Sequence, residues 1–153
     1  MVEVLGLNAY AVTSAPQAYD IVRVAFPYTE MPGEPGPKCR PGLVLSVSAH
    51  VERSTNIPYA TVQVAYGTSS GYSRTVNRAG PENVLRVHNY TALQRSGLSQ
   101  DTYFVLSKNQ KLMWCEEFFP QIEEWNTPIM GKLPRDHVFT LQKLKEIRDS
   151  RRR

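Results

Sequence analysis

The feature that most limits the fold of this chain is a loop rich in proline and glycine between two strand-like segments. The loop spans residues 29–37 and contains Pro32, Gly33, Pro35, Gly36 and Pro37. Proline fixes φ and lacks an amide donor, so this composition excludes a helix and the interior of a sheet. Ile21–Phe26 before the loop is β-branched and aromatic, and Leu43–Val47 after it begins as a continuous apolar run. Both segments are therefore predicted to be strands.

Arg40 lies where this loop ends, because Lys38-Cys39-Arg40-Pro41 leads directly into the second apolar run. Its guanidinium is thus expected at a stiff strand edge rather than at a loop tip. A guanidinium is planar, always charged and suited to binding phosphate oxygens through two parallel hydrogen bonds. An arbitrary loop arginine is usually only solvated, but this position makes Arg40 a candidate phosphate ligand.

Further strands are expected downstream. Ala60–Tyr66 alternates, with Val62, Val64 and Tyr66 on one face. The other expected elements are strands at residues 83–87 and 102–106, a short last strand at 111–114, a polar connection at 48–58, and a short helix at 90–95 that Gly97 would end.

The one strongly predicted helix lies near the C-terminus. Val138, Leu141, Leu144 and Ile147 recur every three residues, and Pro134 suits the first turn. Several short strands followed by one helix predict a mainly β fold of the β-rich α+β kind, a small and strongly bent barrel with a C-terminal helix. The apolar stripe of this helix either caps its own barrel or forms the contact of a two-fold homodimer.

The length of 153 residues suits one domain, expected at residues 18–150. Residues 1–17 are expected to be a weakly ordered lead-in, because Ser14-Ala15-Pro16 breaks any pattern, and residues 151–153 a basic tail. No apolar run approaches membrane-spanning length, and the N-terminus does not resemble a secretory signal. Cys39 and Cys115 match no metal or disulfide pattern. A cytoplasmic protein without metal, cofactor or membrane partner is the expectation.

The positive charge is concentrated at the end of the chain. Six of the 18 basic residues and two of the 14 acidic ones lie from Lys143 onward, which accounts for the whole net charge of +4. The preceding body is neutral and does not indicate binding to a polyanion. Any RNA site must therefore depend on the local placement of arginines.

Four segments resemble the MazF/PemK family of toxin endoribonucleases, in order and with similar spacing. Asp20–Pro27 and Lys38–Ser46 are similar to the opening strand and to the Arg-Pro strand of that family. Val62–Ser70 is similar to its third strand and the Thr/Ser turn after it, and Thr127–Pro134 to the segment before the last helix of longer members. The resemblance covers about residues 20–147 and implies an SH3-like barrel.

The resemblance implies the toxin component of a type II toxin–antitoxin system, an mRNA interferase that cleaves single-stranded RNA without a metal. The 2′-hydroxyl of the RNA attacks the phosphate and leaves a 2′,3′-cyclic phosphate and a 5′-hydroxyl. Arg40 and Thr68 match the catalytic arginine and threonine of the family. Gly67–Gly71 taken alone is also typical of an ordinary turn. The RNA-binding candidates around this pair are Tyr28, Lys38, Ser69, Ser70, Tyr72 and Arg74. The implied partners are RNA, a cognate antitoxin with an acidic segment, and a second copy of the chain.

A proton-transfer partner for Arg40 is not found in the sequence. The strand in which a carboxylate is expected reads Phe104–Lys108 and contains no acid. Glu30 and Glu34 of the proline-rich loop are the nearest acidic candidates. The three histidines, His50, His88 and His137, have no spacing typical of a relay or a metal site. The alternatives are a non-catalytic toxin of the same fold that binds a protein such as DNA gyrase, as the related CcdB toxins do, and a degenerate member without activity.

Overall fold

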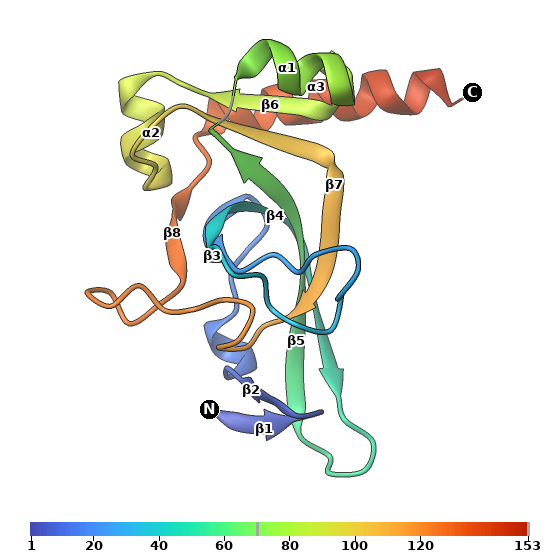
Figure 1. Cartoon of the computed structure of the whole chain (residues 1–153), viewed down its shortest axis with the longest axis vertical. Coiled ribbons are helices and arrows are strands. Elements are labelled where there is room, and N and C mark those ends of the chain that lie inside the picture. The colour runs from blue at the N-terminus through green and yellow to red at the C-terminus, as the bar shows by residue number, and fades with distance from the viewer. Residues whose placement is uncertain (70, 153) are drawn as a thin grey trace.

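The computed structural model describes residues 1–69 and 71–152. Its main sheet has six antiparallel strands in the order β6-β7-β5-β4-β3-β8 (Figure 1). These strands are β3 (Asp20–Val24), β4 (Arg40–Val51), β5 (Pro58–Thr68), β6 (Val84–Val87), β7 (Thr102–Met113) and β8 (Ile129–Lys132). A second sheet pairs β1 (Val2–Val4) with β2 (Leu7–Ala9). The predicted mainly β fold with a C-terminal helix is confirmed.

The sheet is open: its outer strands β6 and β8 are not paired with each other in the described order. The helix α2 (Tyr90–Ser96) lies against β8. A Cβ atom added at Gly131 of β8 would lie 2.5 Å from the Arg95 carbonyl oxygen of α2, so the two backbones are in close contact. A helix thus covers this sheet edge, where barrel closure would require a strand.

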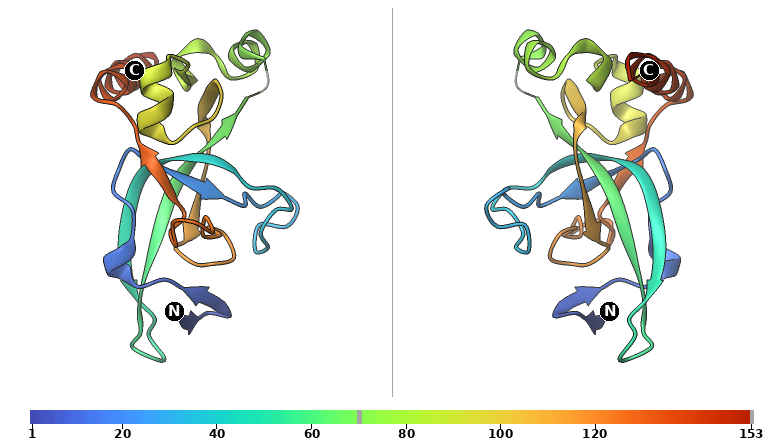
Figure 2. Two further views of the ribbon diagram at one scale, coloured as in Figure 1. Left: turned by 90° about the vertical axis from the view of Figure 1, so that its left-hand side faces the viewer. Right: turned by 90° about the vertical axis from the view of Figure 1, so that its right-hand side faces the viewer.

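Three strands are long and bent. They are β4, β5 and β7, and their bending is visible in Figure 2. The register is irregular between Val44 and Ser46 in the β4–β5 pair, and between Ala65 and Tyr66 in the β5–β7 pair. The separate strand expected at residues 111–114 is wrong, because residues 111–113 are the end of β7. Residues 106–108 bulge out of β7 and interrupt the strand pattern, but β7 continues beyond them after a sharp bend (Figure 1).

Two apolar clusters lie on the two faces of the sheet, because successive residues of a strand point to opposite faces. Val22, Val44 and Val64 belong to one cluster, together with the buried Trp114. Their chain neighbours Ile21, Leu43 and Ala65 belong to the other, together with Phe104 and Leu141 of the C-terminal helix.

Residues 1–17, expected to be a weakly ordered lead-in, instead form the β1–β2 hairpin and the short 3-10 helix η1 (Val12–Ser14). Val4, Ala9 and Tyr10 are buried in the first apolar cluster. The Tyr10 hydroxyl donates a hydrogen bond to the Phe119 carbonyl (2.7 Å). The partners of this hairpin lie about a hundred residues away, so local patterning does not reveal it.

The three α-helices gather at one end of the molecule and the N-terminal hairpin lies at the other (Figure 1). α2 is ended by Gly97 at φ 70°, as predicted. α1 (Tyr72–Ala79) was not predicted; it is eight residues long, and Thr75 is its one buried residue. A second 3-10 helix, η2 (Pro81–Asn83), follows it.

The C-terminal helix α3 (Arg135–Arg151) follows Pro134, as the sequence predicts. Leu141 is buried, and Val138 and Leu144 pack with it on the second apolar cluster. These three residues of the apolar stripe therefore cap the sheet of their own chain, whereas Ile147 is exposed, and the homodimer stays a prediction. Arg151, placed in the basic tail by the sequence, ends α3 and pairs with Glu82 at 2.9 Å. No helix among the described residues has the length and hydropathy needed to cross a membrane.

Candidate active site

Arg40 opens β4 and Thr68 ends β5, so the two predicted catalytic residues lie on neighbouring antiparallel strands. Gly42 pairs with Tyr66, and Leu43 with Ala65. The same register continued by two residues places Arg40 opposite Thr68. Residues directly opposite each other in such a pair have Cβ atoms about 4.5–5.5 Å apart. Strand pairing thus brings the two candidates together.

Gly67 allows the two strands to approach closely beside this pair. A Cβ atom added at Gly67 would lie 2.5 Å from the Pro41 carbonyl oxygen and 2.9 Å from a ring carbon of Phe104. Cβ atoms in folded proteins essentially never come this close to other heavy atoms. A side chain at this position would therefore require a shift of the adjoining strands or of the Phe104 ring.

A cavity of about 210 Å³ lies between Arg40 and Thr68, and we call it the central cavity. Its other polar walls include Ser69, Ser99, Gln100 and Thr102. Hydroxyl and amide groups around a guanidinium provide the donors that a phosphate group requires. The arrangement can therefore hold an anionic, tetrahedral group between the two strand ends.

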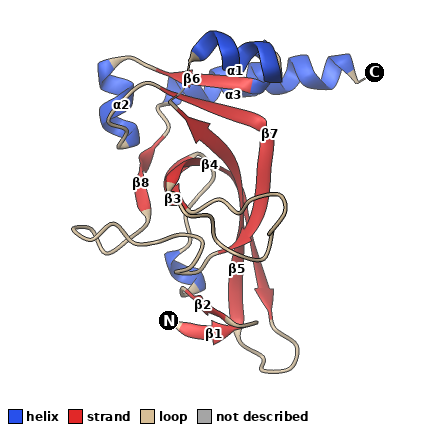
Figure 3. Cartoon of the chain, viewed as in Figure 1, coloured by secondary structure: helices blue, strands red, loops and turns tan. Residues whose placement is uncertain are grey.

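Arg40 also lines two further cavities, one on each side. The tyrosine cavity, about 220 Å³, is bordered by Tyr28 and Lys38, which flank the proline-rich loop, and by Lys108 of β7. The tryptophan cavity, about 400 Å³, is bordered by Trp125 and Arg23. The loops that contribute to them, residues 25–39 and 114–128, are the two long loops in Figure 3. Arg40 is thus the common wall of three adjoining cavities.

Tyr66 positions the Arg40 guanidinium. The Arg40 Cζ atom lies 5.6 Å from the centre of the Tyr66 ring, and the Lys108 ammonium lies 3.9 Å from the same centre. Phe26 supports the ring edge-to-face at a centroid distance of 5.3 Å. Cations are attracted to the face of an aromatic ring. Tyr66 therefore gathers two positive charges at the site, and no acidic side chain among the described residues forms an ion pair with either.

The bulge of β7 explains how Lys108 reaches this ring. Ala65 pairs with Asn109, but the next residue, Tyr66, pairs with Val105, so the intervening residues of β7 bulge out. Bulges often redirect side chains next to functional sites. The strand in which an acid was sought thus supplies a lysine instead.

Five of the predicted site residues line the three cavities: Arg40, Thr68 and Ser69 the central one, and Tyr28 and Lys38 the tyrosine cavity. Ser70 lies outside the described residues. Tyr72 and Arg74 lie on α1 and line none of the three. Tyr72 instead contacts Tyr103 at a centroid distance of 5.4 Å, with the Arg86 guanidinium 4.9 Å from its ring centre.

Sequence reasoning missed Tyr66, Lys108 and Trp125. Strand alternation offered a signal for Tyr66, because residues two apart on a strand share a face and Tyr66 lies two before Thr68. Lys108 depends on the bulge and Trp125 on a long irregular loop, and neither leaves a local pattern.

Acidic and histidine groups are sparse at the site. Glu30 lines the tyrosine cavity, whereas Glu34 lines none of the three. His50 contacts Thr61 at 2.9 Å, and His137 contacts Asp136 at 3.0 Å, a hydrogen bond that lowers the pKa of Asp136. No histidine lines the three cavities. Residues 1–69 and 71–152 contain no cluster of three or more His, Cys, Asp or Glu side chains that could hold a metal ion.

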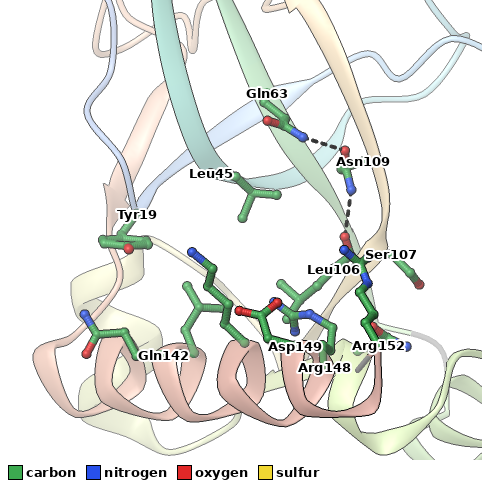
Figure 4. A pocket seen from close by; sticks show the side chains of 13 residues that line it. Tyr19, Leu45, Gln63, Leu106, Ser107, Asn109, Gln142, Arg148, Asp149 and Arg152 are labelled. Carbon is green, nitrogen blue, oxygen red and sulfur yellow. Dashed lines mark hydrogen bonds between the residues drawn. The ribbon is translucent and has the colours of Figure 1, made fainter.

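A separate cavity of about 560 Å³ lies between α3 and the sheet (Figure 4). Gln63 donates to Asn109 (2.9 Å), which donates to the Leu106 carbonyl (2.8 Å). Arg148 and Asp149 of α3 and Arg152, which follows it, approach this cavity (Figure 4), and Lys145 of α3 also lines it. It shares no lining residue with the three cavities around Arg40. Much of the C-terminal positive charge therefore lies away from the candidate active site.

No protein-family model matches the chain, and no curated protein matches it in sequence.

Proposed function

We propose that this chain is an endoribonuclease of the toxin type, cleaving single-stranded RNA at Arg40 and Thr68. The observation that carries the proposal is the central cavity, in which a guanidinium and a hydroxyl side chain from neighbouring strands face the same space. The resemblance of Lys38–Ser46 and Val62–Ser70 to the MazF/PemK family supports it, because the two candidates come from these segments.

The chemistry needs no nucleophile from the protein, because RNA carries one in its 2′-hydroxyl. The 2′-oxygen forms a bond to phosphorus, and the bond from phosphorus to the 5′-oxygen breaks. The proton of the 2′-hydroxyl passes to a base, and the leaving 5′-oxygen receives a proton from an acid. Alignment and positive charge on the developing phosphorane supply most of the rate enhancement.

In this mechanism Arg40 neutralises the phosphorane and Thr68 holds a phosphate oxygen or the attacking hydroxyl. Lys108 adds charge beside Arg40, since both lie against Tyr66. Glu30 is the acidic side chain that borders a cavity shared with Arg40, so we assign it as the candidate proton acceptor. The proposal also includes a cognate antitoxin whose acidic segment competes with RNA for Arg40.

The test is incubation of a long defined RNA with the purified protein in the presence of EDTA. The expected products carry 2′,3′-cyclic phosphate and 5′-hydroxyl ends, which repair enzymes specific for each end identify. Cleavage that stops in EDTA would overturn the metal-independent mechanism. A folded protein that leaves the RNA intact under all conditions would favour the non-catalytic binder or the degenerate member.

A further inference from the structure

We propose that Trp125 is a stacking platform for an unpaired nucleobase of the RNA strand whose phosphate Arg40 holds. The inference rests on the proposed function and adds a residue that determines how the strand lies across the site.

Trp125 is unusual in its exposure. Its side chain is 52% exposed, whereas Trp114, the other tryptophan, is 1% exposed and lies in the core. Leaving a large apolar ring in water forgoes the free energy gained by burial. Exposed tryptophans are enriched where a protein binds a partner, since the rigid ring offers a large contact area.

The loop that carries Trp125 is held in place by hydrogen bonds. The Trp125 and Asn126 amides both donate to the Ile122 carbonyl, at 2.9 and 3.0 Å, and the Ile122 amide donates to the Thr127 carbonyl at 3.0 Å. The Arg23 guanidinium of β3 donates to the Gln121 carbonyl at 3.3 Å. The ring is therefore presented from a structured turn, which reduces the entropy lost when a base stacks on it.

The tryptophan cavity connects this ring to the phosphate ligand. Trp125 and Arg40 line the same space, together with the apolar side chains of Ile122 and Met130. Its volume of about 400 Å³ is within the range of small-molecule sites. A guanidinium next to an apolar and aromatic wall matches a nucleotide, whose phosphate is charged and whose base is flat and uncharged.

The neighbouring charges favour a base over a phosphate at Trp125. Glu123 and Glu124 precede it, are exposed, and do not line the cavity. These two carboxylates disfavour both an RNA phosphate and an acidic peptide beside the ring, but they do not repel an uncharged base. The anionic backbone is thus directed to the Arg40 side of the cavity and the base to the Trp125 side.

The experiment titrates the full-length protein with a short 2′-O-methyl RNA of mixed sequence, whose blocked hydroxyl cannot attack. We expect quenching of tryptophan emission, because Trp125 is the accessible tryptophan and Trp114 is buried. Trp125→Phe should bind with nearly native affinity and lose the quenching. Trp125→Ala should weaken binding about 5- to 150-fold, the range of a lost base–aromatic stack. Phe139→Ala, which removes another exposed ring on α3, is the matched control and should leave affinity unchanged.

The possible failures are distinguishable. Binding without quenching, or unchanged affinity of Trp125→Ala in a protein that cleaves RNA, would overturn the inference and leave the proposed function intact. Binding with quenching in a protein that cannot cleave unmodified RNA would support the base site and overturn the nuclease. A probe that does not bind at all would overturn the base site, and cleavage of unmodified RNA then decides the nuclease separately.

Discussion

At the scale of single residues, the candidate site depends on how the residues around Arg40 orient its guanidinium. A guanidinium on a loop has many conformations, but here Tyr66 fixes one face of it and strand pairing fixes its backbone. The sequence named Arg40 and Thr68 through their resemblance to a family motif, and the fold places both at one cavity, while their roles stay predictions. It was insufficient for Lys108, whose position depends on a bulge that only the pairing of β5 with β7 reveals.

Thr68 provides a direct test of the proposed hydroxyl contact. Thr68→Ala should lower the cleavage rate about 100-fold or more, since it removes a preorganised contact to the reacting group. Thr68→Ser should lower it only mildly, because the hydroxyl matters more than the methyl group. The measurement is single-turnover cleavage of one defined RNA. Equal activity of the two variants would show that Thr68 is only a turn residue.

Gly67 tests whether close strand approach is required. In Gly67→Ala the new methyl group would clash with the Pro41 carbonyl and the Phe104 ring, and overpacking of this kind costs about 1–3 kcal/mol. We expect a lower free energy of unfolding in urea together with slower cleavage. Gly33→Ala is the matched control, because nothing lies within 4 Å of a Cβ atom at that exposed glycine. Similar effects of both substitutions would contradict this role of Gly67.

At the scale of elements, strands with local signals were predicted and those with distant partners were not. β3, β4 and β5 show β-branched or alternating runs, whereas β1 and β2 are three residues each and are stabilised by the 115–119 segment. α1 escaped prediction because it is only eight residues long, although Tyr72, Val76 and Ala79 have helical spacing. The turn between β4 and β5 shows how polar residues define an element boundary.

Glu52 holds that turn together. Its carboxylate accepts hydrogen bonds from the Thr55 amide (2.7 Å) and from the hydroxyls of Thr55 and Ser54, which lower the pKa of Glu52 from 4.5 to about 2. A lowered carboxyl pKa stabilises the folded state fully above pH 4.5, and the stabilisation is lost as the pH falls toward 2.

Glu52→Gln should therefore be less stable than the native protein at pH 7, and the difference should shrink below about pH 4.5 and disappear near pH 2. Urea midpoints measured across this range give the comparison. Glu34→Gln is the control, because Glu34 makes no side-chain hydrogen bond within the described residues. A stability difference that does not depend on pH would contradict the role of the ionised carboxylate.

At the scale of the whole molecule, positive charge is divided between two places. Four cations line the cavities around Arg40: Arg23, Lys38, Arg40 itself and Lys108. Lys145, Arg148 and Arg152 instead line the separate cavity between α3 and the sheet. The net charge counted along the sequence places the excess on α3, but the folded chain assembles a local cluster from residues of the neutral body.

This division predicts a shallow salt dependence of RNA binding. Each phosphate contact on a single strand contributes a slope of about −0.7 to log K against log salt, so four cations give about −3 or shallower. Lys145→Ala and Arg152→Ala should leave the slope unchanged, whereas Lys108→Ala should make it shallower by about 0.7. If Lys145→Ala or Arg152→Ala made the slope shallower, the result would place the RNA at α3 and contradict this prediction.

The central claim is that Arg40 acts on the scissile phosphate, and one comparison tests it most directly. Cleavage of a defined RNA in EDTA is measured for the native protein, Arg40→Ala, Arg40→Lys and Arg74→Ala, with circular dichroism to confirm folding. The account predicts that Arg40→Ala lowers the cleavage rate at least 100-fold. Arg40→Lys should not restore it, because lysine cannot bind phosphate through two parallel hydrogen bonds. Arg74→Ala should cleave at a near-native rate, since Arg74 lines none of the three cavities. A folded Arg40→Ala protein that cleaves RNA at the native rate would contradict it.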